Sequence, residues 1–169
     1  TTTRIAVFAI FSSRAASAIT HLLGEDFKGV VNCDRAKMYY LVQHLQWCWS
    51  HLIRDIQAMI DSGVPDRVFL GQKLDEQTKA MFHNWHRYKS QTITWEEFQA
   101  QTIPIAKKFN ELLYQGGGSH DSKLRNQCLA LHKHHENLWR FLCNKDIEPT
   151  NNAAERALRG PVIYRKLSF

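Results

Sequence analysis

A chain of 169 residues, with 44% hydrophobic and 22% charged side chains, has the size and composition of one ordinary globular domain. It contains no run of 18 or more apolar residues, which excludes a helical membrane span. The formal net charge of +6, with 22 Lys and Arg against 16 Asp and Glu, leans mildly toward a polyanionic partner. Because Thr1–Arg4 shows neither an initiator Met nor a secretory signal, we expect a piece of a longer, cytoplasmic protein.

The four cysteines argue for reduced thiols. Cys33, Cys48, Cys128 and Cys143 lie in apolar surroundings and form no Cys-x-x-Cys pair, which argues against a zinc ribbon. Free thiols in a cytoplasmic protein are the simplest interpretation, with a disulfide as the open alternative.

The beginning of the chain has the pattern of a strand, a helix and a second strand. Residues 4–11 are rich in branched and aromatic side chains, 14–23 follow a Ser cap, and 27–33 are again strand-like. Such a unit favours a parallel pair with a right-handed crossover. Asp34 would then follow the carboxyl end of its strand, where α/β proteins place their active sites.

The middle of the chain is predicted to be helical. Residues 36–44 read as a helix and 45–49 as a third short strand, and the apolar positions of 52–60 then follow one helical face. Further apolar stripes predict a helical bundle over 66–144. Residues 116–119, three glycines and a serine, read as a flexible break within it.

The last segment carries strong helix signals. It has Thr and Asn caps within 148–152 and a Gly-Pro stop at 160–161. Asn151, Glu155 and Arg159 are spaced i, i+4 and i+8, so they share one face of the helix. No acidic residue follows Glu155, whereas four basic ones do: Arg156, Arg159, Arg165 and Lys166.

Three stretches together resemble a known protein family. The first is 29–34 (Gly-Val-Val-Asn-Cys-Asp), followed by Tyr-Tyr at 39–40. The second is 46–55 (Gln-Trp-Cys-Trp-Ser-His-Leu-Ile-Arg-Asp). The third is 148–159, followed by 165–169. In order and spacing they resemble the insertion sequence 66 family of bacterial DDE transposases. The third stretch is the most specific.

The resemblance implies a ribonuclease-H-like α/β fold with a large all-helical insertion before the last catalytic helix. Residues 1–50 would be a partial α/β region whose first strands are missing, 51–147 the insertion, and 148–169 the final helix and basic tail. It also implies a triad of carboxylates that binds two Mg²⁺ (or Mn²⁺) ions and cleaves and transfers DNA strands. The implied partners are transposon ends, target DNA and further copies of the chain.

Residue by residue, Asp34 matches the second acidic position of the triad and Glu155 the third, both as catalytic metal ligands. The first Asp is expected upstream of this chain, so we expect the isolated piece to bind metal weakly and to be catalytically inactive. Cys48 and His51 match a Cys-x-x-His signature, for which we favour a structural role as core thiol and core imidazole. Arg35 stands where the family usually has Gly, which adds a charge near the metal site.

Each carboxylate also has a simpler interpretation. Asp34 could be an ordinary turn residue, and Glu155 could cap its helix with Asn152 or pair with Arg159. A solvated helix face is the better interpretation of three neighbouring histidines that lack i, i+4 spacing: His132, His134 and His135.

Five basic residues are candidates for DNA phosphate contacts: Arg54, Arg156, Arg159, Arg165 and Lys166. The alternative function is a catalytically inactive remnant that acts as a basic DNA-binding or protein-interaction module, and a helical regulatory domain is a third possibility.

The strand order of the expected fold raises a physical problem. In a ribonuclease-H-like sheet, ordered 3-2-1-4-5, the strands at 4–11 and 29–33 would be the third and fourth and would not be neighbours. We therefore expect the isolated chain to leave an unpaired edge, to dimerise or to rearrange its strands.

Overall fold

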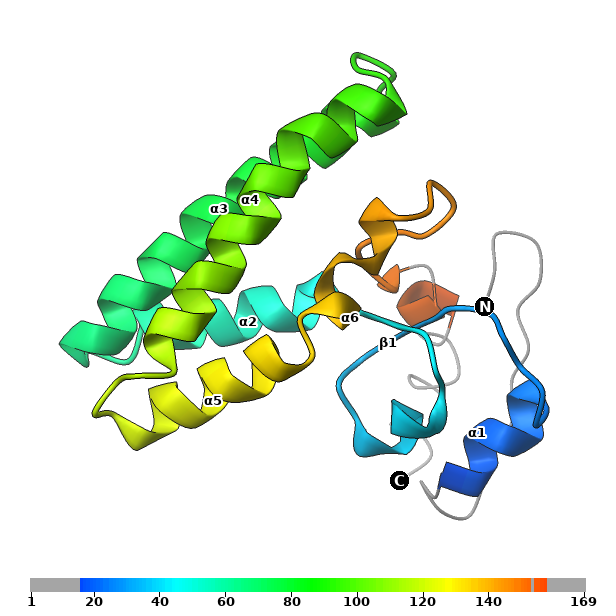
Figure 1. Ribbon diagram of the computed structural model, residues 1–169, viewed down its shortest axis with the longest axis horizontal. Helices are drawn as coiled ribbons and strands as arrows, with labels where there is room; N and C mark the ends of the chain where they lie inside the picture. Colours follow the sequence, from blue (N-terminus) through cyan, green and yellow to red (C-terminus); the bar gives the residue numbers. More distant parts are fainter. Residues whose placement is uncertain (1–15, 153, 158–169) are drawn as a thin grey trace, which may run out of the picture.

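The computed structural model describes residues 16–152 and 154–157 (Figure 1). The protein is mostly helical with one small parallel sheet, and so is α/β in character. A long helical hairpin projects away from the part that holds the sheet (Figure 1). The elements in chain order are α1 (Ala16–Leu23), β1 (Val31–Cys33), the 3-10 helix η1 (Lys37–Leu41), β2 (Leu45–Trp47), α2 (Trp49–Ile60), α3 (Pro65–Lys89), α4 (Trp95–Gly116), α5 (Ser122–Lys133), α6 (Glu136–Trp139) and the 3-10 helix η2 (Arg140–Leu142).

The sheet in the described residues consists of β1 and β2, which run parallel. Val31 is paired with Leu45 and Cys33 with Trp47. The pairing extends one step further, because Cys48 N donates to Cys33 O at 2.8 Å. The crossover between these parallel strands contains only η1, and so is short for a connection of this kind.

The elements before α2 follow the sequence prediction in part. The helix predicted at 14–23 is confirmed over Ala16–Leu23, whereas the predicted helix at 36–44 is only the 3-10 helix η1. The strand predicted at 27–33 is shorter, since only Val31–Cys33 are paired in the sheet. The Phe27 ring packs on Gly29, where a Cβ would lie 2.6 Å from Phe27 Cζ. The strand predicted at 4–11 lies outside the described residues.

Helix α2 packs one apolar face against α3, as its spacing predicted. Ile53, which the sequence pattern placed on that face, is instead 38% exposed. The buried residues of the helix are Trp49, Leu52, Ile56 and Met59.

The hairpin is formed by α3 and α4, and a third helix, α5, packs against α4. Helix α4 begins with a capping box in which Thr94 and Glu97 bond to each other's backbone N–H groups. Helix α5 begins at Asp121, which caps Leu124 N at 2.7 Å and also accepts two hydrogen bonds from Arg67 of α3. The helical bundle predicted over 66–144 is confirmed.

The predicted flexible break at 116–119 is wrong at its first residue. Gly116 is the last residue of α4, and a Cβ on it would lie 2.5 Å from both Cys128 Sγ and Leu70 Cδ2. Here the glycine permits three helices to approach closely, because a side chain would not fit between them.

Buried hydrogen bonds join the sheet to the helical part. Gln46 of β2 is fully buried; its Nε2 donates to Leu138 O at 3.1 Å, and its Oε1 accepts from Phe141 N at 2.8 Å. Trp49 Nε1 donates to the same Leu138 carbonyl at 2.8 Å. One cluster of buried side chains therefore extends from Ile19 to Leu142. Among the described residues, no helix is long and apolar enough to cross a membrane.

Candidate functional site

The carboxyl ends of the two strands meet at one edge of the sheet. Asp34 directly follows β1, and Cys48 directly follows β2 as the N-cap residue of α2. The hydrogen bond from Cys48 N to Cys33 O holds these two strand ends side by side. Side chains that leave the strands here therefore start from neighbouring positions, as expected at the active edge of a parallel sheet.

The segment that precedes Glu155 is attached to this edge through its backbone. Asn32 of β1 donates from Nδ2 to Glu148 O at 2.7 Å and to Thr150 O at 3.1 Å. Trp49 N, at the start of α2, donates to Pro149 O at 3.0 Å. A segment 100 or more positions from its partners in sequence is thus fixed to both β1 and α2.

Two further contacts fix the start of the last helical turn. Ser50 Oγ donates to Asn152 Oδ1 at 3.0 Å, and Asn151 N donates to Cys48 Sγ at 3.4 Å. Glu155 N then donates to Asn151 O at 3.1 Å, which is a helical hydrogen bond. The position of the Glu155 backbone is therefore set by the first turn of α2.

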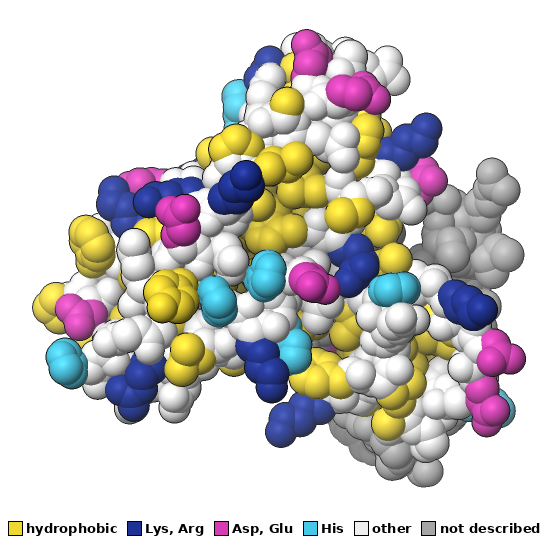
Figure 2. Space-filling model, in the orientation of Figure 1, with side chains coloured by type: hydrophobic (Ala, Val, Ile, Leu, Met, Phe, Trp, Pro, Cys, Tyr) yellow, Lys and Arg dark blue, Asp and Glu magenta, His cyan; other side chains and the backbone are white. Residues whose placement is uncertain are grey.

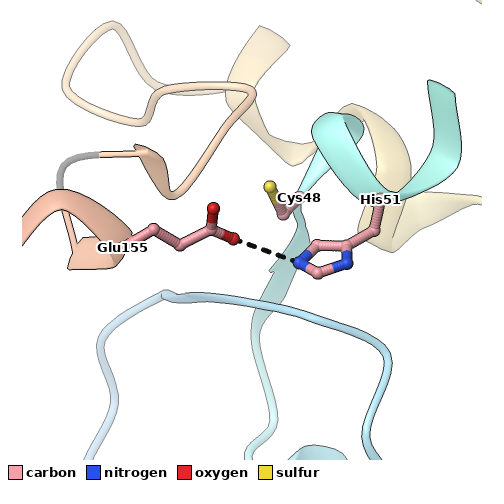
Figure 3. Close-up of side chains that lie close together, drawn as sticks. All are labelled: Cys48, His51 and Glu155. Carbon is pink, nitrogen blue, oxygen red and sulfur yellow. Dashed lines mark hydrogen bonds and ion pairs between the residues drawn. The ribbon is translucent and has the colours of Figure 1, made fainter. Parts of the chain in front are cut away.

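Three side chains from these elements converge. One ligand atom each of Cys48, His51 and Glu155 lies within 4.8 Å of the other two (Figure 3). His51 Nε2 and Glu155 Oε1 are 3.1 Å apart. Cys48 is 3% exposed, whereas the side chains of His51 and Glu155 are 29% and 48% exposed. The cluster thus has a buried thiol at its base and opens to solvent at the carboxylate.

Arg54 determines which nitrogen of His51 carries the proton. Arg54 Nη2 lies 2.5 Å from His51 Nδ1. A guanidinium group can only donate, so Nδ1 accepts and the proton of a neutral imidazole lies on Nε2, facing Glu155. The three side chains form a chain of hydrogen bonds in which Arg54 donates to His51 and His51 donates to Glu155.

Asp34 has a separate local role. Its Oδ1 accepts a hydrogen bond from Ala36 N at 2.9 Å, so it forms the turn that ends β1. Arg35, expected to add a charge near the metal site, is paired with Asp55 of α2, and burial lowers the pKa of its guanidinium group. The cluster of three described above does not include Asp34.

The four cysteines are free thiols, as predicted. Burial, and then the nearby Asp34 and Cys48, raise the pKa of the Cys33 thiol to about 12, so Cys33 is neutral at ordinary pH. Cys143 is exposed, which contradicts the expectation that all four lie in apolar surroundings.

The predicted site residues have different outcomes. Glu155 contacts His51, and the expected core position of His51 is wrong, because its imidazole is partly exposed and bonded to that carboxylate. Arg54 and Arg156 are exposed, while Arg159, Arg165 and Lys166 lie outside the described residues. On the face shown in Figure 2, basic and acidic side chains of the described residues are interleaved rather than separated into one basic area.

The sequence analysis missed the convergence of Cys48, His51 and Glu155. The signal was present in the i, i+3 spacing of Cys48 and His51, which places both at the first turn of α2. Of the three neighbouring histidines, His134 packs its ring against those of Tyr40 and Trp47, and none belongs to a possible metal-binding group in the part of the chain that the structure describes.

These features define an α/β protein with a large helical part and a group of side chains of metal-binding types at the carboxyl edge of its sheet. The family model described as Transposase IS66 family matches residues 1–169, and the chain belongs to this family. Neither the comparison with curated proteins nor that with solved structures gave a match.

Proposed function

We propose that this chain is part of the catalytic region of a DNA transposase that cleaves and transfers DNA strands with divalent metal ions. Membership of the IS66 transposase family supports this function. The structural observation that carries it is the position of Glu155, whose carboxylate lies within 4.8 Å of the Cys48 thiol. Cys48 in turn is hydrogen-bonded to Cys33, the last residue of the strand that Asp34 follows.

The proposed ligands are the carboxylates of Asp34 and Glu155. Mg²⁺ prefers hard oxygen ligands and retains several waters, so a few carboxylates suffice. The donors present fit this requirement, because Glu155 is half exposed and Asp34 can offer Oδ2 while Oδ1 accepts from Ala36. When bound, two such ions would activate the attacking oxygen and stabilise the leaving oxygen of an in-line displacement at phosphorus.

We further propose that the sheet is part of a ribonuclease-H-like fold. In the order 3-2-1-4-5 the fourth and fifth strands are neighbours. The parallel neighbours β1 and β2 fit these two positions, and the helical part between α2 and residue 148 fits the expected insertion before the last catalytic helix.

DNA is the proposed partner, both as element ends and as target, and the active form is proposed to be an assembly of several copies. Arg54 and Arg156 are exposed, and Arg54 bonds to the imidazole that contacts Glu155, which supports the proposal that both contact phosphates. Arg159, Arg165 and Lys166 would extend this contact along the backbone. Such contacts give salt-dependent affinity that is largely independent of base sequence.

The test is a transposition assay with the intact transposase that contains this chain, acting on a marked copy of its own element. Asp34→Asn and Glu155→Gln each remove a ligand charge without changing size, and we expect each to lower transposition by about 100-fold or more. Asp26→Asn, at an exposed acidic residue outside the site, is the matched control. Immunoblots would confirm equal protein levels.

A second candidate function is supported by the local bonding of Asp34, whose hydrogen bond to Ala36 explains this residue without any metal. In that case the chain would be a catalytically inactive DNA-binding or protein-interaction module. Near-normal transposition in the Asp34→Asn variant would overturn the catalytic assignment. An intact transposase that binds DNA but does not transpose would favour the second function.

A further inference from the structure

We propose that Cys48, His51 and Glu155 form a binding site for a borderline transition-metal ion of the Zn²⁺ class, distinct in ligand chemistry from a magnesium site. The binding site itself does not depend on the proposed DNA-processing activity. The inference rests on the convergence of one sulfur, one nitrogen and one oxygen donor from two elements that are far apart in sequence (Figure 3).

The type of ligand decides which ion the site prefers. Thiolate and imidazole donors select zinc and its neighbours, whereas magnesium is bound by oxygen donors. A set of Cys, His and a carboxylate occupies three positions of a tetrahedral zinc ion and leaves the fourth for water or another ligand. Cys48, His51 and Glu155 supply such a set.

The distances are close to those that zinc requires. Zn–S of about 2.3 Å and Zn–N or Zn–O of about 2.0 Å place tetrahedral ligand atoms roughly 3.3–3.6 Å apart. His51 Nε2 and Glu155 Oε1 are already 3.1 Å apart, and all three ligand atoms lie within 4.8 Å of one another. Small side-chain rotations, including one of the half-exposed Glu155, would provide the remaining adjustment.

The surroundings of the sulfur are also suited to a ligand. Asn151 N donates a hydrogen bond to Cys48 Sγ at 3.4 Å, and contacts of this kind orient a metal-binding group and stabilise its charge. The same bond ties Cys48 to the helix that carries Glu155. The segment at 151–155 therefore contacts the thiol and also carries the carboxylate.

Arg54 is expected to weaken the binding of a zinc ion at this site. Its guanidinium group lies 2.5 Å from His51 Nδ1, where it adds a positive charge and a donor, whereas a metal-bound imidazole favours an acceptor at that position. This opposition makes a specific prediction: replacing Arg54 with Gln, which can accept a hydrogen bond, would tighten zinc binding by about 10-fold.

The consequence for activity rests on the function proposed above. Glu155 is shared between the proposed zinc site and the proposed magnesium ligands, so zinc held by Cys48 and His51 would withdraw that carboxylate from catalysis. Zinc would then inhibit the transposase, and Cys48→Ser would relieve the inhibition.

The first experiment titrates the chain with Co²⁺, whose bonds to thiolate give a charge-transfer absorption in the near ultraviolet. A Cys143→Ser background removes the exposed thiol. We expect one equivalent of Co²⁺ to bind with this absorption, to be displaced by Zn²⁺, and to lose affinity by about 10-fold or more in His51→Ala and Glu155→Gln. His132→Asn, in the separate histidine group, is the matched control and should bind normally.

Cys48→Ser should remove the charge-transfer absorption, and its persistence would overturn the proposal. Because Cys48 is buried and its replacement could disturb folding, X-ray absorption of the zinc-loaded Cys143→Ser chain provides a second measurement. We expect one sulfur at about 2.3 Å with nitrogen and oxygen at about 2.0 Å. A zinc coordination shell without sulfur would show that the ion binds elsewhere and would refute the site.

The two proposals fail in distinguishable ways. Asp34→Asn should leave the cobalt absorption unchanged while lowering transposition. If Cys48→Ser removes cobalt binding but Asp34→Asn transposes normally, the zinc site stands and the catalytic assignment fails. If Asp34→Asn abolishes transposition and the chain never binds cobalt through sulfur, only the zinc site is refuted.

Discussion

His51 Nε2 lies 3.1 Å from Glu155 Oε1 and joins two residues that are 104 positions apart in sequence. His51 comes from the first turn of α2 and Glu155 from the last helical segment, while the α3–α4 hairpin lies between them in the chain. The segment at 148–155 is held at the sheet edge by contacts with β1 and α2, and these contacts bring the carboxylate back to the imidazole across the length of the helical part.

The contact between His51 and Glu155 predicts that an amide donor can replace the imidazole. His51→Gln retains an N–H donor near the carboxylate, whereas His51→Ala removes it. We expect His51→Ala to lower transposition by about 10-fold and His51→Gln by less, since a hydrogen bond to a charged group contributes about 1.5 kcal/mol or more when it is well formed. Equal losses in both variants, measured as transposition frequency at equal protein levels, would argue against this role.

The fully buried Trp49 is predicted to be a main determinant of stability. Its ring contacts Trp139 and Phe109, with centroid distances of 4.8 and 5.3 Å, and its Nε1 donates to Leu138 O. Trp49→Ala should lower the free energy of unfolding by about 3–5 kcal/mol, because it leaves a large cavity. Trp49→Phe should cost less, about 1–3 kcal/mol, mainly through the lost hydrogen bond. Urea denaturation would measure both, and similar costs for the two variants would contradict the argument.

The close packing at Gly116 predicts that even one methyl group is not tolerated. Gly116→Ala would place Cβ 2.5 Å from Cys128 Sγ and Leu70 Cδ2, and should destabilise the chain by about 1–3 kcal/mol. Gly118→Ala is the matched control, since the nearest atom there is Gln115 O at 3.4 Å. Thermal unfolding should separate the two variants, and equal melting temperatures would show that the α4–α5 contact is looser than described.

The buried thiol of Cys33 predicts loss of stability in alkali. Its folded pKa is raised to about 12 from an ordinary value of 9.0, so above pH 9 the unfolded chain loses this proton before the folded chain does. The contribution of the protonated Cys33 thiol to the free energy of unfolding is complete below pH 9. It falls as the pH rises toward 12, by up to about 1.4 kcal/mol per pH unit. Urea denaturation at several pH values should show that the free energy of unfolding falls less steeply with pH in Cys33→Ala than in the unchanged chain. Parallel curves for the two proteins would contradict the prediction.

The basic tail predicts DNA affinity that depends on salt. Arg159→Ala and Lys166→Ala should each weaken binding to duplex DNA of any sequence and reduce the salt slope by about one unit. Lys79→Ala is the control, because this residue lies on α3, where it pairs with Asp75. Unchanged retention on DNA in both tail variants would favour the protein-interaction role over DNA binding.

The sequence alone determined the helical character of the middle of the chain. This character depends on local periodicity: the apolar face of α2 and the cap of α4 are set by residues within a few positions of each other. The parallel pairing of β1 with β2 came only from the structure, because the pattern predicted a pair between 4–11 and 27–33, and residues 4–11 lie outside the described part of the chain.

Only the tertiary structure brings Cys48, His51 and Glu155 together. The sequence presented Cys48 and His51 as a pair and Glu155 as a separate helical residue, and nothing in their spacing brings the two together. The bonds from Asn32 and Trp49 to the backbone of 148–150 carry the last segment back to the sheet edge. Contacts across 100 or more residues depend on how the whole chain packs, and no local pattern encodes them.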